Sequence, residues 1–452
     1  MNARPGILLL ALVSAGCTPD IPVTPIDTAA TDLQLRALIG QWNVVMLGDL
    51  PEQPAAQVEL GRMLLFDKVL SGNRDVSCAT CHDPALAGAD GMALSVGTGG
   101  TGRGSDRALG AGRQFIPRNA PSLLNQGMRT QSIFWDGRVS GSVQGPFTTP
   151  AKAAVLPPVS NILAAQALFP VTNREEMRGN PGDVDVFGNP NELALLADTA
   201  FTAIWQAVMG RLLAIPEYVQ LFKAAYPAVP AASLGFQHAA QAIAAFEMSA
   251  YTRADSPFDR YLRRDDNALT VEQKRGGALF FGTARCAQCH TGAVLGGTRF
   301  ENTGVPQVGP GTTPGAPLDW GRAAAVKDTN PKSRFGFRVP PLRNVELTAP
   351  YMHNGAFPTL ESVVLHYEDV TNSLKSYDPS SLAPPVRAMY HGDAATVNAV
   401  LVSLNSGLRS TLNLTGEQKA NLVAFLKALT DPSARELGSL KPVRVPSGLP
   451  VD

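Results

Sequence analysis

Two short stretches decide the fold of this chain: Cys78-Ala79-Thr80-Cys81-His82 and Cys286-Ala287-Gln288-Cys289-His290. Both have the spacing Cys-x-x-Cys-His, which attaches a c-type haem. On one helical turn the two thiols reach the two vinyl groups of a porphyrin, and the next imidazole points at the iron. The sequence therefore predicts two covalently bound haem c groups, with His82 and His290 as iron ligands.

Two other kinds of site also use a Cys-x-x-Cys pair. A zinc ribbon places its two pairs about 15–20 residues apart, whereas these pairs lie in different halves of the chain. A thioredoxin-like dithiol gives no reason for a histidine after both pairs. Because the chain has only 6 histidines in 452 residues, this double coincidence favours haem.

The first 17 residues have the order of a secretory signal: Arg4, an apolar run from Ile7 to Val13, and then Ser14-Ala15-Gly16-Cys17. Small residues before a cysteine resemble a lipobox, although Ser14 stands where leucine is usual. We therefore expect a periplasmic protein, with a lipid anchor if Cys17 is modified. Since the other four cysteines form the two pairs, disulfides are not expected to stabilise the fold.

Composition excludes one class of function. Hydrophobic residues make up 44%, charged residues 17%, and the formal net charge is zero. These values describe a globular protein without the basic surface that attracts nucleic acid, so no nucleic-acid partner is expected. No later segment has the ~18 apolar residues that a membrane-spanning helix needs.

The order of a helix, a Cys-x-x-Cys-His motif, a Gly-rich loop and further helices occurs twice in the chain. It predicts an all-α fold with two cytochrome c-like haem domains in tandem and long Gly/Pro-rich loops. Residues 60–66 resemble residues 275–281, and each stretch lies a short step ahead of its cysteines. Further helices are expected at 162–168, 192–209, 215–226 and 234–251. The expected division is a signal peptide at 1–17, a tether at 18–45, an N-terminal haem domain at 46–255, a C-terminal haem domain at 256–435 and a tail at 436–452.

Three further stretches carry a resemblance: Phe134-Trp135-Asp136-Gly137-Arg138, Pro340 to Asn344, and Leu347 to Gly355. Together with the haem motifs they resemble the bacterial di-haem cytochrome c peroxidases and their relative MauG, the maturation enzyme of methylamine dehydrogenase. The resemblance runs from about Val58 to about Tyr367. It implies that hydrogen peroxide reacts at the N-terminal haem, while the C-terminal haem stores or relays electrons.

The resemblance also assigns roles to single residues near the first haem. Trp135 would relay electrons between the haems, and Gln166, Pro170 and Glu176 match the family's Gln-x3-Pro-x5-Glu pattern over the open face of the first iron. A carboxylate in an apolar pocket can move a proton between the two peroxide oxygens, which suits Glu176. Without this pattern, Glu176 would be read as a solvated helix charge and Trp135 as a core residue.

Two further metal assignments follow from the same resemblance. Asn119, with the backbone carbonyls of Thr348 and Pro350, would hold a calcium ion between the domains. The sixth ligand of the second haem would stand fourteen residues after His353. That position is Tyr367, as in MauG, whereas the peroxidases have methionine there. Met352 is the rival ligand, and the sequence leaves the choice open.

The first iron departs from many members of the family. Their loop after the first motif supplies a second histidine, but between His82 and His238 this chain has none. The first haem is therefore expected to be open to a ligand, as in MauG.

Three functions remain open at this point. The first is a peroxidase that takes electrons from a small cytochrome c or a cupredoxin, and the second is a MauG-like oxidase that modifies a partner protein. The third is a di-haem electron carrier without enzymatic activity. The open first iron and the pair Gln166 and Glu176 disfavour the electron carrier. Tyr367 favours the MauG-like oxidase. The sequence also leaves open whether the protein forms a homodimer.

Overall fold

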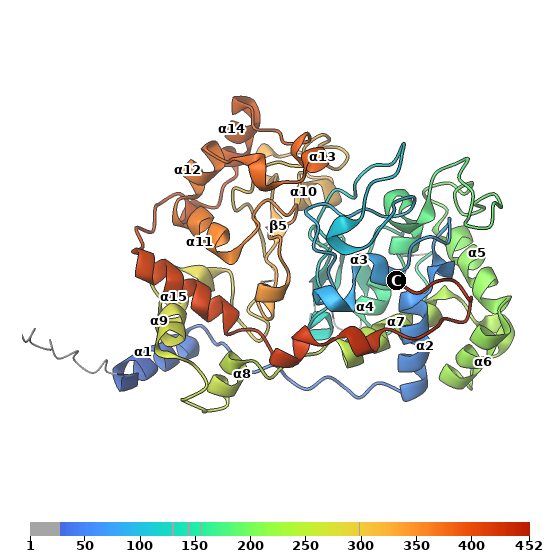
Figure 1. Ribbon diagram of the computed structural model, residues 1–452, viewed down its shortest axis with the longest axis horizontal. Coiled ribbons are helices and arrows are strands. Elements are labelled where there is room, and N and C mark those ends of the chain that lie inside the picture. Colours follow the sequence, from blue (N-terminus) through green and yellow to red (C-terminus); the bar gives the residue numbers. More distant parts are fainter. Residues whose placement is uncertain (1–27, 129–130, 143–144, 154, 298) are drawn as a thin grey trace, which may run out of the picture.

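The computed structural model describes residues 28–452 apart from 129–130, 143–144, 154 and 298. The expected signal peptide and Cys17 lie outside the described residues. The described part is mainly helical and divides into two lobes, each with its own hydrophobic core (Figure 1). None of its helices has both the length and the apolar character needed to cross a membrane.

The N-terminal lobe is built on helices α2 (Ala55–Phe66) and α7 (Phe236–Ala250), which pack against each other. Around them lie the helices α3 (Cys78–Cys81), α4 (Ile162–Ala167), α5 (Phe201–Leu213) and α6 (Pro216–Ala225). A small antiparallel sheet adds β1 (Ser132–Ile133), β2 (Val139–Gly141) and β3 (Phe147–Thr148). Helix α4 begins at an effective cap, because the Asn161 side chain accepts a hydrogen bond from the Ala164 amide at 2.9 Å.

The C-terminal lobe repeats this plan with α9 (Val271–Phe281) and α15 (Gly416–Lys427) as its central pair. Both helices begin with a threonine and glutamine capping box, Thr270 with Gln273 and Thr415 with Gln418. The remaining helices are α8 (Pro257–Leu262), α10 (Arg322–Ala325), α11 (Leu360–Glu368), α12 (Val370–Lys375), α13 (Pro384–Arg387) and α14 (Ala394–Val402), and β4 (Phe300–Glu301) pairs with β5 (Phe337–Arg338).

The resemblance between residues 60–66 and 275–281 has a packing reason. A Cβ on Gly61 would lie 1.9 Å from the Ala242 carbonyl oxygen and 2.9 Å from the Cβ of Phe246. A Cβ on Gly276 would lie 1.8 Å from the Asn421 carbonyl oxygen and 2.8 Å from the Cβ of Phe425. Each glycine therefore lets two helices cross in backbone contact, and the same crossing occurs in both lobes.

A second feature recurs in both lobes, at the loop that follows each haem motif. Asn125 and Asn344 both adopt a left-handed conformation, with φ of 56° and 63°. Their side-chain oxygens accept hydrogen bonds at 2.8 Å from the amides of Arg253 and Asp431, which follow α7 and α15. Asparagine tolerates this backbone region better than most residues, so each loop is fastened to the end of its lobe's last central helix.

The two ends of the described chain cross between the lobes. The expected tether at 18–45 differs from the structure, because Thr28–Gln41 form helix α1, which packs on α9 in the C-terminal lobe (Figure 1). Its Leu35 is fully buried there. The tail at 436–452 instead returns to the N-terminal lobe, where Val445 and Leu449 join the core.

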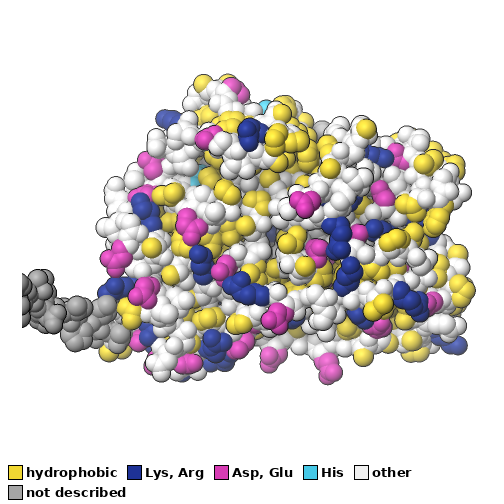
Figure 2. All heavy atoms as spheres, in the orientation of Figure 1, with side chains coloured by type: hydrophobic (Ala, Val, Ile, Leu, Met, Phe, Trp, Pro, Cys, Tyr) yellow, Lys and Arg dark blue, Asp and Glu magenta, His cyan; other side chains and the backbone are white. Residues whose placement is uncertain are grey.

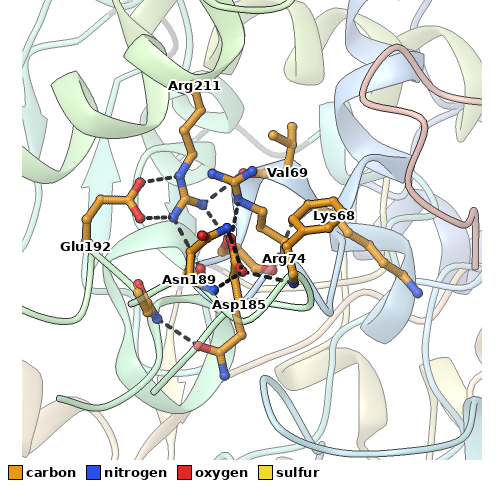
Figure 3. A network of polar contacts seen from close by, with 12 residues as sticks. Lys68, Val69, Arg74, Asp185, Asn189, Glu192 and Arg211 are labelled. Atoms are coloured by element: carbon orange, nitrogen blue, oxygen red, sulfur yellow. Dashed lines mark hydrogen bonds and ion pairs between the residues drawn. The ribbon is translucent and has the colours of Figure 1, made fainter. Parts of the chain in front are cut away.

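The helix expected at 192–209 is wrong in its first part, since α5 begins only at Phe201. The Asn191 side chain accepts hydrogen bonds from the amides of Leu193 and Ala194, which holds a turn in place of a helix. Figure 3 shows the adjacent polar network, in which Arg211 of α5 contacts the Glu192 carboxylate at 2.5 and 2.7 Å. Arg211 also donates to the Ser71 carbonyl at 2.7 Å, so this loop is tied to the segment that precedes the first haem motif.

The surface agrees with a zero net charge. On the face drawn in Figure 2, basic and acidic side chains are interspersed, and neither sign gathers into a continuous patch.

Candidate active site

A cavity of about 280 Å³ in the N-terminal lobe, here called the first cavity, brings together the predicted site residues. It is lined by Cys78, Cys81, His82, Trp135, Gln166, Pro170 and Glu176. Residues about a hundred positions apart in sequence thus meet around one space. The sequence placed these side chains in one site only through a family resemblance, and the fold places them there independently.

The haem motif of this cavity is held in a defined geometry. Helix α3 begins at Ser77, whose amide donates to the Thr80 hydroxyl at 2.9 Å. The Nδ1 atom of His82 lies 3.0 Å from the Gly88 carbonyl oxygen, and burial lowers the pKa of this imidazole. With Nδ1 directed at a backbone carbonyl, Nε2 is the nitrogen that would ligate the iron.

A cavity of about 250 Å³ in the C-terminal lobe, the second cavity, is lined by Cys286, Cys289 and His290. Here the Nδ1 atom of His290 lies 3.0 Å from the Leu295 carbonyl oxygen. Burial lowers the pKa of His290 to about 4. In both cavities, two thiols and an oriented imidazole border an apolar space, and these are the groups that a covalent haem requires.

Trp135 lines both cavities. Its indole Nε1 donates to the Asn119 carbonyl at 2.9 Å, and its ring meets that of His353 edge-on with centroids 6.5 Å apart. His353 is in turn stacked on Phe337 at 3.5 Å. An aromatic chain therefore runs from the wall between the cavities into the second cavity.

Glu176 is fixed by its backbone. Its amide donates to the Asn173 side chain at 2.9 Å, and its carbonyl accepts from the Thr98 amide at 3.0 Å. The approach is close because residue 97 is glycine: a Cβ there would lie 2.4 Å from the Glu176 carbonyl oxygen. Burial raises the pKa of the Glu176 carboxyl, while the guanidinium of Arg138 opposes that rise. A partly buried carboxyl of this kind can hold and release a proton.

Sequence reasoning missed a second carboxyl in the first cavity, Glu247 on α7. It is 7% exposed, and burial raises its pKa to about 8. Since Phe246 and Phe425 occupy matching crossings, Glu247 corresponds to Leu426, which lines the second cavity. The available signal was a lone acidic residue on the apolar face of the expected helix at 234–251.

The second cavity contains both rival ligands, Tyr367 and Met352. His366 is excluded as a ligand, because its Nδ1 contacts the Ser373 hydroxyl at 2.9 Å and its Nε2 the Thr303 carbonyl at 2.8 Å. Both ring nitrogens are thus engaged by the protein. Tyr367 and Met352 both line the cavity, so the choice between these two expected ligands stays open.

The calcium assignment fits the chemistry of its donors. Asn119, Thr348 and Pro350 all line the second cavity. The Asn119 side-chain nitrogen donates to the Met92 carbonyl at 2.6 Å, which leaves its amide oxygen available. Within the described residues, no backbone amide donates to the carbonyls of Thr348 or Pro350. Three oxygens of this kind suit a hard cation.

Comparisons with known proteins agree with this geometry. A family model described as di-haem cytochrome c peroxidase matches residues 55–267, and one described as RoxA-like, cytochrome c-like matches residues 336–369. The cytochrome c551 peroxidase of Pseudomonas aeruginosa is 34% identical over 308 residues, which cover 68% of this chain and 70% of that protein. The methylamine utilization protein MauG of Methylorubrum extorquens is 30% identical over 311 residues, which cover 69% and 68%.

Two solved structures are also similar. A MauG-like protein associated with microbial copper homeostasis superposes with a TM-score of 0.58 at 27% identity, covering 88% of this chain and 98% of that one. The di-haem peroxidase BthA from Burkholderia thailandensis superposes with a TM-score of 0.57 at 21% identity, covering 86% and 89%. The second likeness is one of fold.

Proposed function

Because this chain belongs to the di-haem cytochrome c peroxidase family and is a di-haem peroxidase, we propose that hydrogen peroxide is reduced in the first cavity with electrons supplied through the second. The observation that carries this assignment is that Gln166, Pro170 and Glu176 line the same cavity as Cys78, Cys81 and His82. The second cavity is also lined by a carboxyl, that of Glu301, but this group is engaged by the Asn405 amide at 2.6 Å and by the Arg299 guanidinium at 2.6 Å.

The chain's own residues supply binding and proton transfer. The cysteines of each motif hold the haem, His82 and His290 ligate the irons, and haem supplies the electron chemistry when bound. Glu176 takes a proton from one oxygen of hydrogen peroxide and returns it to the other as the O–O bond breaks. Gln166 orients the peroxide, and Pro170 keeps the adjacent wall apolar.

Electron transfer between the cavities would use Trp135, because it lines both. Calcium held by Asn119, Thr348 and Pro350 would stabilise the same wall. The duplicated helix crossings support two cytochrome c-like units in tandem. We assign the protein to the periplasm, where a small cytochrome c or a cupredoxin would be its electron donor.

A MauG-like oxidation of a partner protein is the second candidate. The presence of Tyr367 in the second cavity favours it, since an anionic phenolate stabilises oxidised iron better than a thioether does. The partner would then be oxidised at the protein surface through Trp135, with no small electron donor required.

Glu176→Gln tests the peroxidase assignment. Removal of a positioned proton-transfer group typically slows a reaction ~10²–10⁴-fold, so the stopped-flow reaction with hydrogen peroxide should slow by that order. Both haem spectra should stay unchanged. The matched control is Glu175→Gln, because Glu175 is adjacent but does not line the cavity. A Glu176→Gln rate within twofold of the parent would overturn the role of Glu176.

A further inference from the structure

Arg138, to which the sequence assigned no role, lines the first cavity together with His82, Gln166 and Glu176. Its Nη2 lies 4.0 Å from the Glu176 carboxylate. Its guanidinium carbon lies 3.6 Å from the centroid of the Phe134 ring, so the planar head is stacked and cannot swing freely. Arg138 therefore places a fixed positive charge beside Glu176, in a cavity whose lining also includes Arg118, Asp136 and Glu247.

The position of Arg138 is set by a buried chain of ion pairs. Its Nη1 lies 3.2 and 3.3 Å from the two oxygens of Asp136. Asp136 also accepts from Arg118 at 2.6 Å, and Arg118 donates two bonds, of 2.7 and 2.9 Å, to Asp319. Asp319 belongs to the other half of the chain and is 4% exposed. The two lobes thus share the support of this guanidinium.

Donors remain available on Arg138 for a ligand. Among the described residues, its side chain donates hydrogen bonds only through Nη1, and only to Asp136. Nε and Nη2 are left without an acceptor at hydrogen-bond distance in that part of the chain. An arginine with two free donors, held in a cavity by an ion-paired partner, is suited to a small anion.

We propose that the first cavity is a binding site for small monoanions, with the guanidinium of Arg138 as the group that holds them. This inference rests on the proposed function, since its physiological occupant would be the hydroperoxide anion. When Glu176 takes the proton of hydrogen peroxide, an O–H bond breaks in the peroxide and one forms on the carboxylate. The negative charge then passes from Glu176 to the hydroperoxide, and Arg138 adjoins both sites.

Azide, an anion at pH 7, tests the site in the oxidised holoprotein through the change in the haem absorption spectrum. A lost charge-assisted hydrogen bond should raise the azide dissociation constant of Arg138→Gln roughly tenfold or more. The dissociation constant of imidazole, a ligand without negative charge, should change less than twofold. Arg103→Gln is the matched control, because Arg103 pairs with Asp83 on the surface of the same lobe, and it should bind azide normally.

Arg138→Lys keeps the positive charge and should recover part of the azide affinity; if Arg138→Gln fails to assemble, Arg138→Met makes the same prediction as a second neutral variant. The proposal is overturned if the azide constant changes less than twofold, or if azide and imidazole weaken equally, which would indicate a deformed pocket. Peroxide turnover of the parent protein is measured separately. If turnover is absent while azide binding depends on Arg138, the proposed function fails and the anion site stands.

Discussion

At the scale of single residues, the two cavities differ in where they contain polar groups. The first is lined by the carboxyls of Asp136, Glu176 and Glu247, whereas the second is lined by one, that of Glu301, and has Leu426 at the position that corresponds to Glu247. A buried carboxyl costs free energy unless it is neutral or paired. The difference therefore indicates that the two haem environments, built on one plan, are specialised for different steps.

The choice between Tyr367 and Met352 gives the first prediction at this scale. Tyr367→Phe should change the spectrum of the low-spin haem, and the oxidised parent should lack the near-infrared band of methionine ligation, since a phenolate and a thioether donate differently to iron. Met352→Leu is the matched comparison and should leave that spectrum unaltered. If only Met352→Leu alters the low-spin haem spectrum, Met352 is the ligand. The peroxidase function is then favoured over the MauG-like function.

Glu247 gives a prediction of pH dependence. Its pKa rises from 4.5 to about 8 on folding, so between these values the folded state binds more protons than the unfolded state. The contribution of Glu247 to the free energy of unfolding is therefore most favourable at low pH, and it falls as the pH rises from 4.5 to about 8. Denaturant unfolding at pH 5 and pH 9 should therefore show Glu247→Gln gaining ~2–4 kcal/mol on the parent at the higher pH.

The control for this experiment is Glu59→Gln, whose side chain is 46% exposed on α2. It should follow the pH profile of the parent. A Glu247→Gln profile parallel to that of the parent would show that the carboxyl is solvated or paired in the folded protein.

At the scale of elements, the backbone contacts of α2 with α7 and of α9 with α15 decide the shape of each lobe. Gly61 and Gly276 are required because any side chain would meet a carbonyl oxygen of the opposite helix. A side chain at either position would force the two helices apart. This would move Glu247 of α7 in the first cavity or Leu426 of α15 in the second.

Gly61→Ala and Gly276→Ala should each destabilise the protein by about 1–3 kcal/mol, the usual cost of overpacking. Denaturant unfolding measures this change. Gly210→Ala on α5 is the matched control, because nothing lies within 4 Å of the added Cβ. It should be neutral or stabilising by up to ~1 kcal/mol, since alanine favours a helix. Equal effects at all three glycines would contradict the close crossing.

At the scale of the whole molecule, each lobe is completed by the opposite end of the described chain. Helix α1 packs on the C-terminal lobe, and the tail packs on the N-terminal lobe. In the tail, Asp452 contacts Lys68 at 2.7 Å and also the Thr80 hydroxyl within the first haem motif. Ser447 donates to Asp67 at 2.6 Å. The two lobes are therefore held together by chain crossings as well as by the Arg118 ion pairs.

Deletion of residues 442–452 should consequently destabilise the N-terminal lobe, although the tail follows the C-terminal lobe in sequence. Exposing the sites of Val445 and Leu449 should cost about 3 kcal/mol or more in unfolding free energy. The control is Val443→Ala, since Val443 is fully exposed and should contribute nothing. Unchanged stability after the deletion would mean that the tail is not part of the core.

The haem attachment and the helices beside it could be predicted from local residue patterns. Cys78 to His82 and Cys286 to His290 act through local covalent spacing, and each motif is preceded by a glycine-containing helix, α2 or α9. Trp135, Gln166, Pro170 and Glu176 were located by a family pattern, and the structure gathers them around one cavity.

Other site residues could be placed only from long-range contacts in the folded chain. Glu247 joins the first cavity because α7 packs on α2. Arg138 is held by Asp136, which also pairs with Arg118, and Arg118 in turn pairs with Asp319 of the other lobe. The expected tether became helix α1 because Leu35 could be buried against α9. Such contacts join residues that are distant in sequence, and burial gives them their energy. Local sequence patterns therefore cannot predict these contacts.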